Sequence, residues 1–318
     1  MKAYDNSSLL DFFHQQLQQH SPIIPPADGM HTAVTVDTLI EAVHFPVATP
    51  PAWVAHKALA VNLSDLAAMG ASPVEISLGL IIPSWDDSWL QAFAEGLRAL
   101  CKTWSLHLSR CHVSEGPLSV TIQAHGYVAA GKALRRSNAR PGDQILVTGT
   151  LGDAACALPY YLQHQALPSR YQEFLQQRLN YPQPRVSTGL LLAGLANAAV
   201  DISDGLAADL GHILEESHVG ARLQLEKLPA SSATQALLSD EQRMMLQLGG
   251  GDDFELCFTI PELHVETMYT LLKDEGVTCT WIGEIVEGDS IEYRLHGEPV
   301  VLSIKGYDHF SADKDERL

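Results

Sequence analysis

The stretch that most constrains the fold is residues 199–210, where a short apolar run leads through acidic residues into a helical pattern. Asp201 and Asp204 are three residues apart, and Ser203 lies between them. The apolar residues that follow have the i, i+4, i+7 and i+8 spacing of one buried helix face: Leu206, Leu210, Ile213 and Leu214. The pattern predicts a helix that begins near Ser203, with acidic side chains at its start.

Two interpretations of these acidic residues are open from this stretch alone. The amides and the dipole at a helix start favour negative groups, so two carboxylates beside a serine are a good place to hold a metal ion against a phosphate. Alternatively, Ser203 caps the helix, and Asp204 and Asp209 are acids that favour its first turns. The rest of the chain has to decide between a metal site and a capped helix.

The net charge of the chain limits the kinds of molecule that it can bind. The chain of 318 residues has 38 acidic and 20 basic residues, and its formal net charge is −18. Such a surface repels a nucleic-acid backbone, so no nucleic-acid partner is expected. An acidic protein can still bind phosphorylated substrates when Mg²⁺ ions bridge its carboxylates to the phosphates.

The same sequence predicts a cytoplasmic protein without a membrane partner. No apolar stretch approaches the length of a membrane span, and the polar start lacks the pattern of a signal peptide. The five cysteines are odd in number and include no Cys-x-x-Cys pair, which is typical of reduced thiols.

Segments with strand patterns alternate with segments of helical periodicity. We expect strands at residues 33–36, 75–82, 118–128, 144–148, 221–225, 254–260 and 279–285. We expect helices at residues 53–69, 87–104 and 262–275, besides the helix from Ser203. Residues 162–185 are polar and rich in Gln, Tyr and Pro, so they are predicted to be a surface segment.

A loop at residues 137–143, with Pro141-Gly142 as its turn signal, divides this pattern. We place a domain boundary there, which gives an N-terminal domain of residues 1–136 and a C-terminal domain of residues 137–318. Both halves mix strands and helices, so the fold class is predicted to be α/β (α+β) with two domains.

Further acidic residues stand at the ends of expected elements. Asp37 closes the first strand, Asp65 follows Ser64 in a helical segment, and Asp252 and Asp253 follow a run of glycines. Acids from several segments can converge into one multi-metal cluster, which phosphoryl transfer needs for charge neutralisation. Each residue alone is also explained as a cap or a turn residue.

Several other kinds of site are excluded by their missing motifs. The sequence has no P-loop, no kinase-type glycine-rich loop and no Gly-x-Ser-x-Gly elbow. The strand-Asp-x-Asp pattern of an aspartyl-phosphate phosphatase is absent as well. Four residues could be imagined as a zinc site, but their spacing fits no common pattern: Cys101, His107, Cys111 and His112.

Assembled in order, these segments resemble the thiamine-monophosphate kinase family, of the superfamily that includes aminoimidazole ribonucleotide synthetase. The resemblance runs from about residue 27 to residue 310. It rests on residues 36–45, 57–71, 136–143, 201–210, 250–256 and 305–310.

The resemblance implies a fold, a reaction and a set of site residues. It implies an N-terminal mixed sheet that forms a homodimer and binds ATP and metal, followed by a C-terminal α/β domain. The implied reaction transfers the ATP γ-phosphate to thiamine monophosphate. The Mg²⁺ ligands would be Asp37, Asp65, Asp201 and Asp204, and the residues at ATP would be Arg136 and Ser203. The residues that hold the thiamine phosphate would be His44, Asp252 and Tyr307.

The sequence departs from the family pattern in two places. The family has a Gly-Ile-Gly-Asp-Asp segment where this chain has residues 18–21, without an acid. It also has Gly-Gly-Asp-Thr where this chain has Arg110, Cys111 and His112. In the family, the glycines let ATP approach the backbone closely, and this chain lacks them. His112 offers a nitrogen atom to Mg²⁺, which prefers oxygen ligands.

These departures keep two alternatives open beside the kinase. One is a catalytically impaired paralogue that binds thiamine phosphate or nucleotide without transferring phosphate. The other is a related ATP-using enzyme with a different substrate, against which His44, Asp252 and Tyr307 argue because the implied substrate side is retained.

Overall fold

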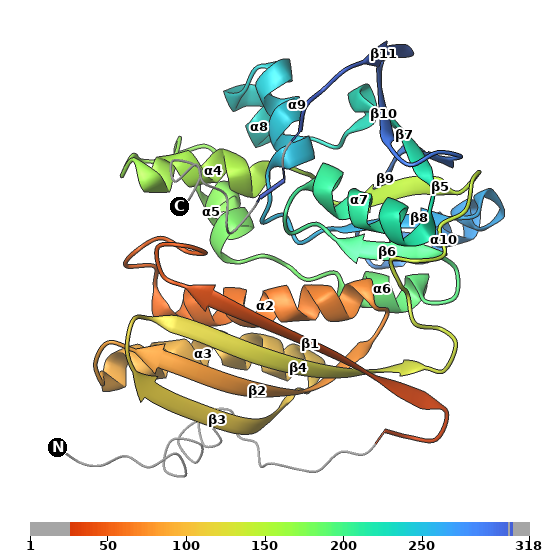
Figure 1. The fold of residues 1–318 in the computed structure, drawn as a ribbon. Helices are drawn as coiled ribbons and strands as arrows, with labels where there is room; N and C mark the ends of the chain where they lie inside the picture. The colour runs from red at the N-terminus through yellow and green to blue at the C-terminus, as the bar shows by residue number, and fades with distance from the viewer. Residues whose placement is uncertain (1–25, 305, 308–318) are drawn as a thin grey trace.

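The structure is a computed structural model that describes residues 26–304, 306 and 307. Its N-terminal half is a four-stranded sheet with two helices on one face (Figure 1). The elements in chain order are β1 (Met30–Ile40), α2 (Pro51–Ala68), β2 (Ser72–Ile82), α3 (Asp87–Trp104), β3 (His107–Glu115) and β4 (Ser119–Ala129). The sheet order is β1-β4-β2-β3; β4 is antiparallel to β1 and β2, and β2 is parallel to β3.

The C-terminal half is a seven-stranded mixed sheet with helices around it (Figure 1). Its strands are β5 (Gln144–Thr148), β6 (Ala198–Asp201), β7 (Gly220–Gln224), β8 (Leu256–Ile260), β9 (Cys279–Val286), β10 (Ile291–Leu295) and β11 (Glu298–Val300). Its helices are α4 (Asp153–Leu162), α5 (Gln172–Asn180), α6 (Val186–Leu192), α7 (Leu206–Ser217), the short 3-10 helix η1 (Leu225–Lys227), α8 (Ser232–Leu237), α9 (Asp240–Gly249) and α10 (Glu262–Asp274). The sheet order is β11-β10-β7-β9-β5-β8-β6.

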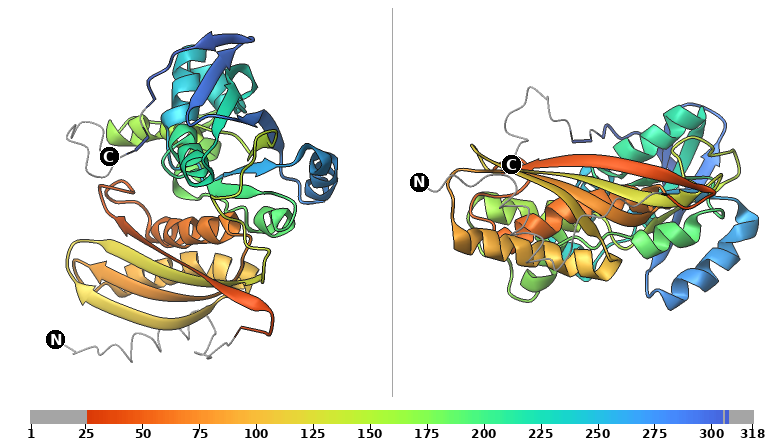
Figure 2. Two further views of the ribbon diagram at one scale, coloured as in Figure 1. Left: turned by 45° about the vertical axis from the view of Figure 1, so that its right-hand side comes forward. Right: turned by 90° about the horizontal axis from the view of Figure 1, so that it is seen from below.

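Helix α2 lies between the two halves and is buried on nearly all sides (Figures 1 and 2). This fits its sequence, which is apolar around the whole helix rather than along one stripe. Helix α3 packs so closely against it that a Cβ at Gly96 would lie 2.1 Å from the Ala52 carbonyl oxygen. The largest core cluster joins residues of both halves, so the two halves share one hydrophobic core through α2.

The predicted fold class is confirmed, with mixed α/β structure in both halves. The helix after Asp204 is α7, and the four apolar residues predicted for its inner face are all buried. The predicted domain boundary at residue 137 lies in the connection between the two sheets. In the part of the chain that the structure describes, none of the helices combines the length and apolarity needed to cross a membrane.

Residues 162–185 lie mostly at the surface, as predicted, but they contain a helix that the sequence did not predict. This helix is α5, and its side chains Leu175 and Leu179 are buried against α4. Few apolar residues suffice here because two residues four apart already form one buried helix face. The strand β3, the helices α6, α8 and α9, and the strands β10 and β11 were also not predicted as separate elements.

Candidate functional site

Three of the predicted metal ligands meet from three different elements. Asp37 is on β1, Asp65 is on α2, and Asp201 is the last residue of β6. Burial, and then the neighbouring Asp65, raises the pKa of Asp37 to about 7. Burial also raises the pKa of Asp65, and burial and Asp65 together raise the pKa of Asp201 well above its usual range. Buried carboxylates that repel one another in this way are stabilised when a cation joins them.

The donor set fits Mg²⁺ in its chemistry, because Mg²⁺ takes oxygen ligands and is held by carboxylates together with substrate phosphates. Thr35 supports the set by donating its hydroxyl hydrogen to the Asp65 carboxylate. Among the described residues, however, no three His, Cys, Asp or Glu side chains converge as a ready-made metal site.

The turn before α7 is organised by Asp209 and not by a serine cap. The Asp209 carboxylate accepts hydrogen bonds from the backbone N–H groups of Ser203 and Asp204, each at 3.0 Å. The helix begins at Leu206, and Gly205 is its N-cap residue, without a side-chain cap. The interpretation of Ser203 as the cap is therefore wrong: Asp209, one turn into the helix, supplies the acceptor instead.

A cavity of about 470 Å³ opens beside these acids, between the two halves of the molecule. We call it the central cavity. Six of the nine predicted site residues line it: Asp37, His44, Ser203, Asp204, Asp252 and Tyr307. Asp65 and Asp201 lie next to Asp37, outside the cavity lining. Arg136 is exposed and acts from a distance, lowering the pKa values of Asp65 and Asp209 against the larger effect of burial.

Backbone hydrogen bonds tie the predicted substrate residues to the predicted metal residues. The Asp252 N–H donates to the Ser203 carbonyl at 2.8 Å, and the Tyr307 N–H donates to the Asp204 carbonyl at 3.1 Å. Asp252 adopts a left-handed conformation with φ +70°, which is costly for a non-glycine residue and needs such support. The two ends of the central cavity are thus built on one hydrogen-bonded framework.

Lys57 is a residue at this site to which the sequence assigned no role. It lies on α2, and its Nζ is 2.5 Å from Asp252 Oδ2 and 3.2 Å from the His44 carbonyl oxygen. A signal was present in the sequence, because Lys57 is the sole Lys or Arg of a helix that is otherwise mostly apolar. A buried ammonium needs a partner, which points to a carboxylate elsewhere in the fold.

Two segments of the chain depart from the family pattern, and the structure describes one of them. Residues 18–21 lie outside the described residues. On β3, Arg110 and His112 are exposed, while Cys111 between them is buried. Cys101 is buried as well, and burial raises the pKa of both thiols to about 12, which opposes their use as thiolate metal ligands.

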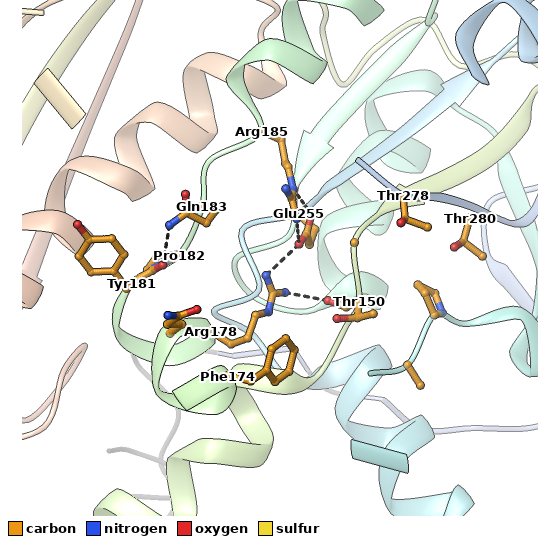
Figure 3. A pocket seen from close by; sticks show the side chains of 14 residues that line it. Thr150, Phe174, Arg178, Tyr181, Pro182, Gln183, Arg185, Glu255, Thr278 and Thr280 are labelled. Carbon is orange, nitrogen blue, oxygen red and sulfur yellow. Dashed lines mark hydrogen bonds and ion pairs between the residues drawn. The ribbon is translucent and has the colours of Figure 1, made fainter. Parts of the chain in front are cut away.

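A second cavity, of about 450 Å³, lies beside α5, and we call it the α5 cavity (Figure 3). Arg178 and Arg185 both point toward the buried Glu255 (Figure 3). Arg185 binds Glu255 through Nε and Nη2 at 2.6 and 2.7 Å, and Arg178 Nη1 binds it at 2.9 Å. These ion pairs join α5 and the segment after it to Glu255, the residue before β8.

Comparisons with known proteins match both halves of the chain. The family description "AIR synthase related protein, N-terminal domain" matches residues 19–128, and the corresponding C-terminal domain matches residues 140–296. The thiamine-monophosphate kinase of Salmonella typhimurium is 44% identical over 88% of this chain and 86% of its own length. That of Haemophilus influenzae is 40% identical over 99% of this chain and 98% of its own length.

Solved structures show the same fold. The thiamine-monophosphate kinase of Stenotrophomonas maltophilia superposes with a TM-score of 0.85 at 39% identity, covering 92% of this chain and 96% of its own. AaThiL, solved in complex with AMPPCP and TMP, superposes with a TM-score of 0.79 at 27% identity, covering 98% of both chains. The chain therefore belongs to the thiamine-monophosphate kinase family of AIR synthase related proteins.

Proposed function

We propose that the protein transfers the γ-phosphate of ATP to the phosphate of thiamine monophosphate, giving thiamine diphosphate. The observation that carries this proposal is the central cavity, where Asp37, Ser203 and Asp204 face the same space as Asp252 and Tyr307. The relatives that match nearly the whole chain are named for this activity. Two phosphorylated molecules need one cavity with a charge-neutralising side and a side that recognises the acceptor molecule.

The acidic side would hold Mg²⁺ through Asp37, Asp65, Asp201 and Asp204, with Arg136 and Ser203 as contacts for ATP. Bound there, Mg²⁺ would supply charge neutralisation for the phosphates. The protein itself contributes by positioning these residues. Asp209 holds the backbone of Ser203 and Asp204 in one conformation, so less conformational entropy is lost when substrate binds to them.

The other side would hold thiamine monophosphate through His44, Asp252 and Tyr307. The His44 Nδ1 accepts a hydrogen bond from the Ile40 N–H at 2.9 Å, which holds the imidazole in place at the wall of the cavity. Asp252 offers an acceptor for N–H groups of the substrate. Tyr307 can stack on a flat cationic ring.

We further propose a cytoplasmic homodimer with the domains 1–136 and 137–318. Support for the dimer comes from the face of the four-stranded sheet opposite α2 and α3, where β1 exposes Val34, Val36 and Ile40. Three apolar side chains on one exposed strand face are a feature of interaction surfaces.

Binding without phosphoryl transfer is the second candidate. The observation in its favour is His112, which is exposed on β3 and stands where the family has an aspartate. A histidine neither neutralises charge as a carboxylate does nor suits Mg²⁺. Losing one such contribution commonly lowers a rate by a hundredfold or more.

The test is a phosphoryl-transfer assay with ATP, Mg²⁺ and thiamine monophosphate, run beside calorimetric titrations of each ligand. Turnover near the ~1 s⁻¹ of a slow kinase supports the kinase and excludes the binding protein. Binding of both ligands without turnover overturns the kinase proposal. The variant His112→Asp should raise the rate if the acidic cluster is otherwise complete, and Cys111→Gly is added only afterwards because Cys111 is part of the core.

A further inference from the structure

We infer that Lys57 is a positioning residue for thiamine-phosphate recognition. It holds Asp252 and the segment that carries His44 in one geometry without touching the substrate itself. This inference rests on the proposed function, because it assigns the substrate end of the central cavity to Asp252 and His44.

The contacts of Lys57 reach both substrate residues at once. Its Nζ is 2.5 Å from Asp252 Oδ2 and also donates to the His44 carbonyl at 3.2 Å. Asp252 lies 195 residues further along the chain, in the turn before β8, and His44 lies in the turn after β1. One ammonium group on the central helix therefore joins two loops from opposite halves of the molecule.

Lys57 stands behind the wall of the cavity. Its side chain is 3% exposed, whereas that of Asp252 is 34% exposed. Asp252 and His44 line the central cavity, and Lys57 does not. Any effect of Lys57 on substrate binding must therefore pass through the residues that it holds.

Both loops need such a support. Asp252 has φ +70°, and in the His44 loop Ala42 has φ +61°, so each loop contains a non-glycine residue in the left-handed region. These conformations are less stable than extended or helical ones and persist where surrounding contacts hold them. Lys57 adds a charged contact to each loop at a residue that lines the central cavity.

The ion pair also sets the charge of the recognition site. With Oδ2 committed to Lys57, the Asp252 carboxylate has Oδ1 left to accept an N–H group of the substrate. Lys57 and Asp252 together carry no net charge, so the pair offers an acceptor atom without repelling phosphates that enter the cavity. Without the ammonium, the same carboxylate would be a negative charge facing an anionic substrate.

The experiment measures binding of thiamine monophosphate and of ATP by calorimetry for wild type and for Lys57→Met, whose side chain is uncharged and similar in shape. We expect the Kd for thiamine monophosphate to rise by ~10–100-fold and the Kd for ATP to stay within about twofold, because a charged hydrogen-bond partner is lost at one end of the cavity. The matched control is Lys102→Met on the exposed surface of α3, which should change neither value.

A double-mutant cycle with Asp252→Asn separates positioning from a general structural role. If Lys57 acts through Asp252, the change Lys57→Met in the Asp252→Asn background should raise the Kd for thiamine monophosphate by no more than about threefold. Lys57→Arg, which keeps the cation, should recover part of the wild-type affinity. If Lys57→Met does not fold, Lys57→Gln takes its place in the cycle.

The inference is overturned if a folded Lys57→Met protein binds thiamine monophosphate as wild type does, or if the two Kd values rise equally. It is also overturned if the effects of Lys57→Met and Asp252→Asn simply add. Calorimetry tests the inference separately from the proposed function. If the wild type binds thiamine monophosphate without turnover, the kinase proposal is overturned. The comparison of Kd values then still decides the role of Lys57. A wild type that does not bind this ligand overturns both.

Discussion

At the scale of single residues, the candidate site depends on buried charged groups whose partners the sequence pattern does not identify. Lys57 meets Asp252, and Asp209 meets the backbone of Ser203 and Asp204. Of these, the sequence pointed to Ser203, Asp204 and Asp252 as site residues, because acids and a serine at element ends are recognisable. It gave Asp209 a role in its own helix, since nothing in the spacing shows which amides a carboxylate will reach.

The role of Asp209 leads to a first prediction. Its carboxylate is 2% exposed and burial raises its pKa to about 7, so a neutral side chain of the same shape is tolerable there if it still accepts hydrogen bonds. We expect Asp209→Ala to lower kcat/KM by ~10–100-fold, as is typical for groups that orient a metal site, and Asp209→Asn to lower it less. Steady-state kinetics of the two variants check this, with Asp240→Asn on exposed α9 as control. Equal activity of Asp209→Ala and wild type would contradict the assigned role.

His56 gives a prediction about pH. Its Nε2 donates to the Pro182 carbonyl at 2.8 Å, its ring stacks on Tyr181, and its Nδ1 is buried without a hydrogen-bond partner among the described residues. Burial lowers the pKa of His56 to about 4, from 6.5 for an exposed histidine. The unfolded chain therefore binds a proton that the folded chain excludes, and the free energy of unfolding falls as the pH drops from 6.5 to about 4.

The size of this effect is at most about 3 kcal/mol over the whole interval. Denaturant unfolding of wild type and His56→Phe at several pH values measures it, because phenylalanine keeps the ring but cannot take up a proton. The difference in stability between the two proteins should depend on pH below 6.5 and be constant above it. A difference that is constant at all pH values would show that His56 is not excluded from protonation in the folded protein.

At the scale of elements, the helices and strands with a regular apolar pattern were predictable and the irregular ones were not. Helix α7 has four buried apolar residues at helical spacing, and its existence followed from residues 206–214 alone. Helix α5 was missed because its inner face consists of Leu175 and Leu179 in a polar segment. Arg178 of α5 and Arg185 after it both bind Glu255, which lies 77 and 70 residues further along the chain, and no local pattern reveals this pairing.

The start of α7 gives a prediction with a control in the same helix. Gly205 has φ +110°, and a Cβ there would lie 2.9 Å from the Gly249 carbonyl carbon. Gly211 lies within the helix, and a Cβ there meets nothing within 4 Å. We expect Gly205→Ala to destabilise the protein by ~1–3 kcal/mol through backbone strain, and Gly211→Ala to stabilise it by ~0.5–1 kcal/mol through helix propensity. Thermal and denaturant unfolding measure whether each variant is less or more stable than wild type. A Gly205→Ala variant as stable as wild type would show that the turn can relax.

At the scale of the whole molecule, α2 is the element on which both halves are assembled. It contributes Asp65 to the acidic cluster and Lys57 to the substrate end, and it packs into the core of both halves. The central cavity is lined by residues of both halves, so a change in the packing of the halves would change the shape of this cavity. The shared core around α2 therefore supports the shape of the candidate site as well as the stability of the fold.

The proposed homodimer is tested at this scale. Light scattering coupled to gel filtration should give twice the chain mass of 34.6 kDa for wild type. Val34→Glu places a charge on the exposed face of β1, where Val34 is 49% exposed, and should shift the protein to monomer because an unpaired charge in an apolar contact is costly. The control Leu263→Glu, at a 76% exposed position on α10, should leave the mass unchanged. A monomeric wild type would contradict the proposed dimer.

The sequence by itself determined the α/β class through apolar periodicity, and the family through motifs along most of the chain. The family resemblance in turn supplied the candidate residues of the site. The tertiary structure alone decided which of these residues share a space. It brought Asp37, Asp65 and Asp201 together from β1, α2 and β6, paired Lys57 with Asp252 and replaced the expected Ser203 cap by Asp209. The first two groups of contacts join residues far apart in the chain and follow from how α2 packs between two sheets. Asp209 reaches the Ser203 and Asp204 amides over only six and five residues, but the direction of its side chain depends on the turn before α7.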